Sequence, residues 1–109
     1  MNDNWFHVCG LHDIAPNTGV CAKVNNKQVA IFRQAASDLL YAIDNFDPIG
    51  KANVLSRGLL AQIGDAITVA SPLYKQHYCL KSGACKEDET VRIPVYKVRL
   101  NGDAIEVQI

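Results

Sequence analysis

The chain has 109 residues, 49% of them hydrophobic, and its formal net charge at pH 7 is zero. This length and composition allow one packed core without metals or disulfides, so we predict a single domain over residues 1–109. Lys and Arg are scattered, which argues against nucleic acid or an anionic membrane surface as a partner. No apolar run approaches the ~20 residues of a membrane-spanning helix.

The first five residues lack the basic start and apolar stretch of a secretory signal peptide, so we expect the chain in the cytoplasm. In that reducing compartment we expect the four cysteines to be free thiols, because no pair forms Cys-x-x-Cys. Cys9 and Cys21 lie in apolar strand patterns and are predicted to be small core residues.

Short apolar runs bounded by turn formers predict β-strands along most of the chain. From the N-terminus these runs cover residues 5–9, 20–24, 28–32, 39–43, 59–63, 66–70, 75–80, 93–100 and 104–109. In the third run, alternation places Val29 and Ile31 on one face. Asn101-Gly102 tolerates positive φ and predicts a hairpin between the last two runs. The helical signal is a single turn at 52–55, so the pattern predicts an all-β fold, a small antiparallel β-sandwich or barrel.

Three residues near the third quarter of the chain have the chemistry of metal ligands: His77, Cys79 and Cys85. His77 and Cys79 share one face if they lie on a strand. Cys79 and Cys85 are separated by five residues, a spacing that fits no common zinc ribbon or finger. We therefore predict no metal site and interpret His77 as a half-buried or solvated imidazole. His7 and His12 have no partner in the pattern and are interpreted as surface or capping residues.

Signatures of catalysis do not occur in the sequence. It has no Gly-x-Ser-x-Gly elbow and no Gly-rich phosphate loop, and Ser56 and Ser71 have no His and acid partners at a recognisable spacing. We predict that this chain has no catalytic residue and binds no cofactor of its own.

Two loops carry more specific motifs. The first opens with Asn45-Phe46-Asp47 and closes with Ser56-Arg57-Gly58-Leu59-Leu60, and the second reads Ser71-Pro72-Leu73-Tyr74. This frame resembles the Rieske-type [2Fe–2S] domains, whose first loop begins Cys-x-His and whose second begins Cys-Pro-x-His. Here the four ligand positions hold Asn45, Asp47, Ser71 and Tyr74. An amide, a carboxylate, a hydroxyl and a phenol do not replace two thiolates and two imidazoles, so the resemblance implies a Rieske-like fold without a cluster.

Longer sequence segments extend the match beyond these loops. Val-Leu-Ser-Arg-Gly-Leu at 54–59 and Ala-Ser-Pro-Leu-Tyr-Lys-Gln at 70–76 are the most specific, and others lie at 18–22, 28–33, 42–48 and 85–89. Together they resemble the small subunits of bacterial assimilatory NADH-dependent nitrite reductases, a family that itself lacks the iron ligands. The resemblance implies a non-catalytic subunit of a cytoplasmic enzyme that reduces nitrite to ammonium. It also implies a large-subunit partner that carries FAD, a [4Fe–4S] cluster and sirohaem.

In an electron-transfer Rieske domain the two loops form the tip that meets the redox partner, and we predict that they form the contact surface here too. Its residues would be Phe46, Pro48, Arg57, Leu73, Tyr74 and Lys75. Aromatic residues beside a cation are typical interface anchors. Alternatively, Phe46 and Tyr74 fill the space of the lost cluster, while Asp47 accepts backbone N–H bonds in its turn; both can hold. The charged segment 86–89 is interpreted as a solvated loop, with acidic docking as the alternative.

Two other functions stay open at this point. One is an electron carrier that holds iron on unusual ligands, which colour would reveal. The other is a Rieske-like electron-transfer or binding module for another oxidoreductase, such as an oxygenase, which co-purification of the native partner would reveal.

Overall fold

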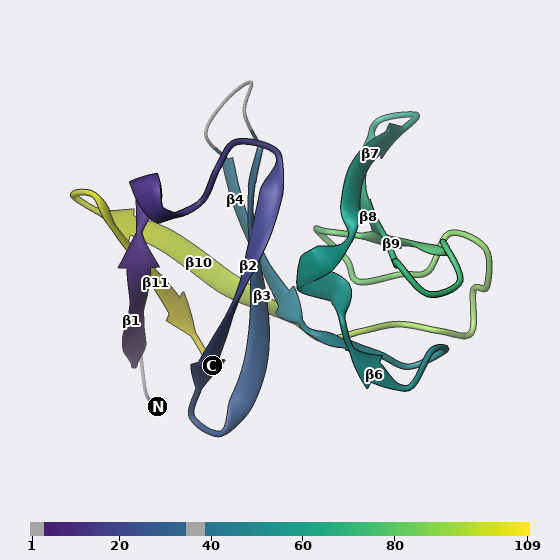
Figure 1. Cartoon of the computed structure of the whole chain (residues 1–109), viewed down its shortest axis with the longest axis horizontal. Coiled ribbons are helices and arrows are strands. Elements are labelled where there is room, and N and C mark those ends of the chain that lie inside the picture. Colours follow the sequence, from purple (N-terminus) through teal and green to yellow (C-terminus); the bar gives the residue numbers. More distant parts are fainter. Residues whose placement is uncertain (1–3, 35–38) are drawn as a thin grey trace.

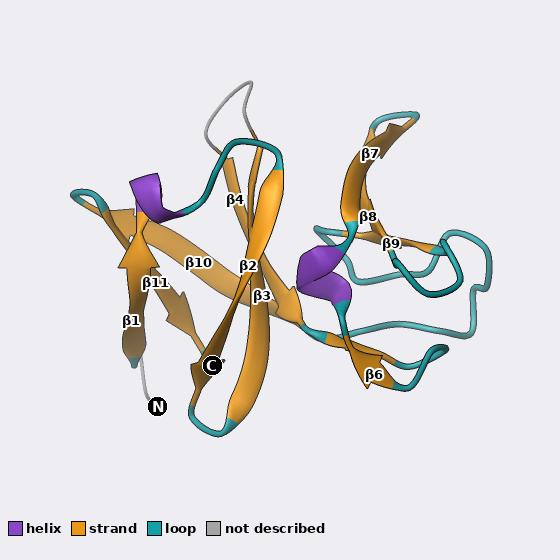
Figure 2. Ribbon diagram, viewed as in Figure 1, coloured by secondary structure: helices purple, strands orange, loops and turns teal. Residues whose placement is uncertain are grey.

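β-Strands dominate the computed structural model, which describes residues 4–34 and 39–109 (Figures 1 and 2). The strands are β1 (Trp5–Gly10), β2 (Thr18–Val24), β3 (Lys27–Gln34), β4 (Leu39–Asp44), β5 (Phe46–Asp47), β6 (Ala52–Asn53), β7 (Leu59–Ile63), β8 (Ala66–Ala70), β9 (His77–Cys79), β10 (Val95–Asn101) and β11 (Ala104–Gln108). Two 3-10 turns, η1 (Leu11–Asp13) and η2 (Leu55–Arg57), are the helical elements in these ranges. Within the same ranges, no helix has the length and apolar character needed to span a membrane.

The larger sheet is antiparallel and curls into a nearly closed, barrel-like layer with strand order β1-β11-β10-β4-β3-β2 (Figure 1). The predicted β10–β11 hairpin is present, but its turn lies one residue later than expected: Asn101 ends β10 and pairs with Ala104, and Gly102, at a φ of +64°, and Asp103 form the turn. The prediction of an all-β, Rieske-like fold is thus confirmed in its strand content and its antiparallel pairing.

Strand β3 is buried on both faces, and Val29 and Ile31 share one face as the sequence predicts. Val29 and Ile31 lie in the core of the larger sheet. Ala30 and Phe32 point the other way, into a second core that contains Tyr78. β3 is therefore a wall shared by two hydrophobic cores.

Two smaller sheets lie beside the large one (Figure 1), and one of them, β7–β9, packs on the second core through Leu60, Ile67, Val69 and Tyr78. β7, β8 and β9 form a three-stranded antiparallel sheet, and β5 pairs with β6. η2 contacts β2 and β3. A Cβ at Gly19 would lie 2.5 Å from the Phe32 ring and 2.9 Å from the Ser56 carbonyl oxygen, so glycine is required where β2 approaches η2.

Every predicted strand is present; 59–63 and 66–70 have the predicted ends, and the others are shifted at one or both ends. The run 75–80 shortens to β9 because a turn occupies residues 71–75, and the run 93–100 enters the sheet only at Val95, after Pro94. The prediction of a helical turn at 52–55 is wrong. Residues 47–51 form a turn that returns the chain, so Ala52–Asn53 pairs with β5 and the 3-10 turn begins at Leu55.

All four cysteines are free thiols, as predicted. Core burial is the wrong prediction for Cys21, which is exposed because it shares its strand face with Lys23, opposite Val20 and Val24. Cys9 is half-buried and packs against the core of the large sheet. The targeting prediction used five N-terminal residues, of which 1–3 lie outside the described residues.

Candidate interaction site at two paired turns

The two loops contain the same five-residue turn. The first reads Asp-Pro-Ile-Gly-Lys at 47–51 and the second Ser-Pro-Leu-Tyr-Lys at 71–75. The Lys51 N–H donates to the Asp47 carbonyl oxygen at 2.6 Å, and the Lys75 N–H donates to that of Ser71 at 3.0 Å. Both lysines have left-handed backbones, with φ of +58° and +61°, which residues other than glycine rarely adopt. The turns are therefore equivalent in shape as well as in sequence pattern.

The first side chain of each turn holds its own turn and contacts the other one. Asp47 Oδ1 accepts the Ile49 N–H at 3.0 Å, and Ser71 Oγ accepts the Leu73 N–H at 3.3 Å, as Asx and Ser turns do. The Ser71 hydroxyl in turn donates to Asp47 Oδ2 at 2.5 Å. One hydrogen bond thus joins two turns that lie 24 residues apart in the sequence.

The Asp47 carboxylate is fully buried and has further partners on and beside β9. Its Oδ1 accepts hydrogen bonds from Gln76 Nε2 at 2.7 Å and from the Tyr78 hydroxyl at 2.9 Å. Gln76 Nε2 also donates to the Tyr78 hydroxyl at 3.1 Å. We call Asp47, Ser71, Gln76 and Tyr78 the Asp47 network.

The Asp47 network stabilises a negative charge. Burial acts to raise the pKa of Asp47, but hydrogen bonds from Ser71, Tyr78 and the backbone outweigh it and hold the pKa below its usual range. Burial and the nearby Asp47 carboxylate raise the pKa of Tyr78, against the opposing hydrogen bond from Gln76. At neutral pH the network therefore consists of one carboxylate surrounded by uncharged donors.

Asn45 forms a separate connection at the end of β4. Its Oδ1 accepts the Ser56 N–H at 2.7 Å. Its Nδ2 donates to Gln28 Oε1 at 3.1 Å and to Cys21 Sγ at 3.4 Å. This buried amide thus ties η2 to the β2–β3 hairpin.

The four ligand-equivalent positions do not fit a [2Fe–2S] cluster. Asn45, Asp47 and Ser71 are buried and engaged in hydrogen bonds within the protein. Tyr74 points away from them and is 70% exposed. Neither the donor chemistry nor the arrangement of these side chains provides two thiolates and two imidazoles.

The interior between the turns is filled by residues that sequence reasoning missed. Phe46 and Tyr74 are 40% and 70% exposed, so they do not plug it, whereas Gln76 and Tyr78 are buried there. The turn role predicted for Asp47 is confirmed by its bond from Ile49. A signal for the missed pair does exist, because alternation in the run 75–80 places a Gln in register with apolar residues, which indicates a buried polar partner.

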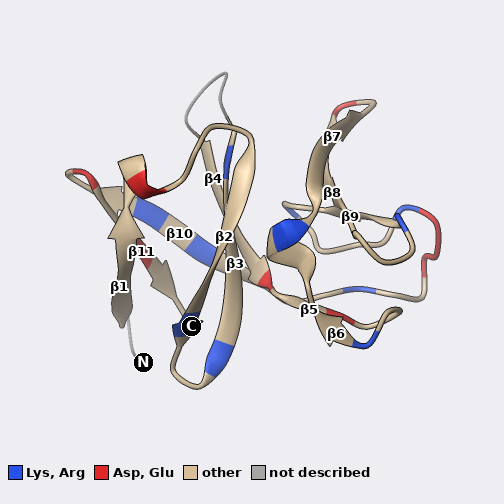
Figure 3. Cartoon of the chain, viewed as in Figure 1, with Lys and Arg blue, Asp and Glu red and all other residues tan. Residues whose placement is uncertain are grey.

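The residues predicted to contact a partner lie in the two turns and beside them, on β5 and η2. Pro48 is half-buried and the others are exposed: Phe46, Arg57, Leu73, Tyr74 and Lys75. Beside the second turn lies a pocket of about 510 Å³. It is lined by Arg57, Gly58, Leu59, Ala70, Ser71, Pro72, Lys75 and His77. Figure 3 shows basic character on η2, while acidic residues gather on the separate loop that leads from β9 toward β10.

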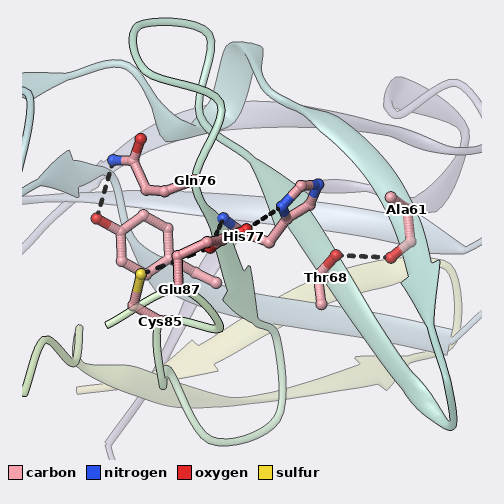
Figure 4. A network of polar contacts seen from close by, with 7 residues as sticks. Ala61, Thr68, Gln76, His77, Cys85 and Glu87 are labelled. Atoms are coloured by element: carbon pink, nitrogen blue, oxygen red, sulfur yellow. Dashed lines mark hydrogen bonds and ion pairs between the residues drawn. The ribbon is translucent and has the colours of Figure 1, made fainter. Parts of the chain in front are cut away.

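Two of the three residues considered as metal ligands, His77 and Cys85, contact the Glu87 carboxylate instead (Figure 4), and Cys79 is half-buried at the end of β9. Glu87 Oε1 accepts the His77 backbone N–H at 2.7 Å, and Glu87 Oε2 lies 2.7 Å from His77 Nδ1. Cys85 Sγ lies 3.8 Å from Glu87 Oε1. Burial acts to raise the pKa of Glu87, but the contacts with His77 outweigh it and lower that pKa. In residues 4–34 and 39–109, no three His, Cys, Asp or Glu side chains form a group suited to a metal ion. His7 and His12 are exposed.

Comparison with known proteins finds a consistent set of relatives. The family model described as the Rieske-like [2Fe-2S] domain matches residues 4–108. The chain is 43% identical over 104 residues to the nitrite reductase (NADH) small subunit of Escherichia coli strain K12, covering 95% of this chain and 96% of that protein. A segment of the nitrite reductase [NAD(P)H] large subunit of Klebsiella oxytoca is 44% identical over 79 residues, which is 72% of this chain and 8% of that protein.

Solved structures agree with the sequence relatives. The NMR structure of the E. coli protein NirD superposes with a TM-score of 0.88 at 43% identity, covering 95% of this chain and 94% of that one. The ferredoxin of carbazole 1,9a-dioxygenase from Nocardioides aromaticivorans has a TM-score of 0.83 at 22% identity, covering 96% and 97% of the two chains. The latter similarity concerns the fold alone.

Proposed function

The chain belongs to the family of NADH-dependent nitrite reductase small subunits, a branch of the Rieske-like domains, and on that premise we propose that it is a non-catalytic accessory subunit. It binds and supports a large subunit that reduces nitrite to ammonium with NADH during nitrate and nitrite assimilation in the cytoplasm. The redox chemistry belongs to FAD, a [4Fe–4S] cluster and sirohaem on that partner, and this chain binds no cofactor.

The Asp47 network is the observation that carries this proposal. In a cluster-bearing domain the two loops exist to hold metal, but here they are held together by hydrogen bonds between Asp47, Ser71 and Tyr78. The loops therefore keep a defined shape without a metal and still present Leu73 and Tyr74 to the outside. A rigid, partly apolar surface suits recognition of a protein partner.

A second observation supports a large subunit as that partner. In the Klebsiella oxytoca relative, a segment similar to 72% of this chain lies within the polypeptide called the large subunit. A domain that one relative joins covalently to the large subunit is well suited to bind it non-covalently in another.

Reconstitution tests the proposal. We would purify the chain and the sirohaem-containing large subunit separately, record a visible spectrum of the chain, and follow nitrite-dependent NADH oxidation by the large subunit with and without it. A colourless chain that binds and raises or restores turnover supports the accessory role. A colourless chain with neither binding nor effect contradicts it. A coloured chain contradicts the absence of a cofactor, and His77, Cys79 and Cys85 would then be the first residues to substitute.

A further inference from the structure

The pocket beside the second turn has an unusual combination of charge and apolar surface. Arg57 of η2 and Lys75 of the second turn both line it, and both are exposed. Its lining residues include no Asp or Glu. In the described part of the chain, neither Arg57 nor Lys75 forms an ion pair, whereas Arg99 is paired with Glu106 at 2.8 Å.

The positive charge is local, because the chain as a whole has a net charge of zero. Lys51 occupies the same position in the first turn that Lys75 occupies in the second, but among the described residues that line the pocket only Arg57 and Lys75 are Lys or Arg. His77 also lines the pocket, with Nδ1 held by Glu87. Cations gathered on one surface of a neutral protein attract an anionic group on a partner and steer its approach.

Apolar surface borders the same pocket. Leu59 is 76% exposed, more than any other large hydrophobic residue described, and it lines the pocket together with Pro72. Tyr74 and Leu73 extend the apolar surface along the second turn. A complementary group therefore has an anionic end and apolar neighbours, which a protein segment provides and a small inorganic ion does not.

The walls of the pocket are fixed before any partner arrives. Gly58 lies so close to β8 that a Cβ there would be 2.4 Å from the Ala70 carbonyl oxygen. Ser71 is tied to Asp47, and Lys75 is bonded through its N–H to Ser71. A preformed site loses less conformational entropy on binding and so gains affinity.

We propose that this pocket receives an Asp or Glu side chain of the large subunit, held between Arg57 and Lys75, while apolar residues beside it cover Leu59 and Tyr74. The inference rests on the proposed function and names the chemistry of the contact. Nitrite is also a small anion with two oxygens, but a pocket of about 510 Å³ with an apolar border is far larger than three atoms require.

The test is the affinity of the intact large subunit for wild type, Arg57→Glu and Lys75→Glu, measured by titration at low and high salt. We expect each reversal to weaken binding about tenfold or more, and wild-type affinity to fall as salt rises. Arg57→Lys retains most of the affinity. Lys97→Glu, on exposed β10 of the large sheet, is the matched control and binds like wild type. Thermal unfolding of each variant separates lost binding from lost folding.

The outcomes distinguish the two proposals. If wild type does not bind the large subunit, the proposed function fails. If wild type binds and both reversals bind equally well, the acidic-contact inference is overturned while the accessory role stands. In the last arm, nitrite is titrated into the isotope-labelled chain and the NMR chemical shifts are followed. Saturable shift changes at Arg57 and Lys75 that the large subunit reverses overturn the inference, and the absence of such changes supports it.

Discussion

Asp47 is the one fully buried carboxylate in the described ranges. A charge removed from water costs several kcal/mol unless hydrogen bonds compensate for its lost hydration. Here the donors are the side chains of Ser71, Gln76 and Tyr78 and the N–H of Ile49. Because these donors come from both turns and from β9, the carboxylate determines how the loops meet.

Asp47→Asn is expected to lower the free energy of unfolding at pH 7 by about 2 kcal/mol, because the amide loses the charge and turns an N–H₂ toward donors. The folded state lowers the pKa of Asp47, so its contribution is complete above the unfolded pKa, about 4, and is lost as the pH falls through the folded value. The difference from wild type should therefore shrink below about pH 4. Urea unfolding at a series of pH values measures this.

The control for that measurement is Asp65→Asn, an exposed carboxylate in the β7–β8 turn. It should leave stability close to wild type at every pH. A difference between Asp47→Asn and wild type that stays constant down to pH 2 would contradict the charged role of Asp47.

Unlike Asp47, Tyr74 has a large side chain that is expected to contribute little to the stability of the fold. It is 70% exposed, so Tyr74→Ala is expected to leave thermal stability unchanged. Since Tyr is a frequent interface anchor, the same variant should weaken large-subunit binding about tenfold. Leu100→Ala, which is also exposed but lies on β10, should not. Equal affinities for the two variants would place the interface elsewhere.

At the scale of elements, the predictable parts are those with a local period. The face assigned to Val29 and Ile31 of β3 is correct because side chains alternate along a strand, but the burial of both faces was not predicted. The β5–β6 pair escapes prediction, since strands of two residues have no period, and the turn at 47–51 creates them. The partners of Asp47 escape because those hydrogen bonds span 24 to 31 residues, and no local pattern encodes such a distance. The sequence motifs showed that other residues occupy the four cluster-ligand positions, but they did not predict where those side chains point.

Two glycines are favoured for different reasons, one for close packing and the other for its backbone conformation. Gly58 has a φ of −73°, which alanine adopts readily, but its Cβ would clash with the Ala70 carbonyl oxygen at 2.4 Å. Gly102 has a φ of +64° with open space around it. Gly58→Ala should cost about 2 kcal/mol or more of stability, and Gly102→Ala about 1 kcal/mol. Denaturant unfolding of both variants checks the order, and the reverse order would contradict the close approach of η2 and β8.

At the scale of the molecule, the described residues form two hydrophobic cores, one on each side of β3. The large sheet surrounds one core, and β7–β9 with η2 and the segment 80–93 cover the other. The paired turns lie beside the second core, where hydrogen bonds to Asp47 and the packing of Leu73 on Gly50 connect the segments. This arrangement separates the scaffold from the surface proposed for recognition, so the surface residues can change with less effect on the fold.

The Asp47 network also has a kinetic consequence. Its bonds join residues that are brought together only after β7–β9 have docked on β3, so they should form late in folding and break early in unfolding. In stopped-flow experiments, Asp47→Asn should therefore unfold faster by about 30-fold and refold at nearly the wild-type rate. An equal slowing of refolding would instead place the network in the folding nucleus. If unfolding alone responds, the lifetime of the folded chain is determined at the same end of the molecule that we propose as the contact for the large subunit, and a partner bound there would prolong it.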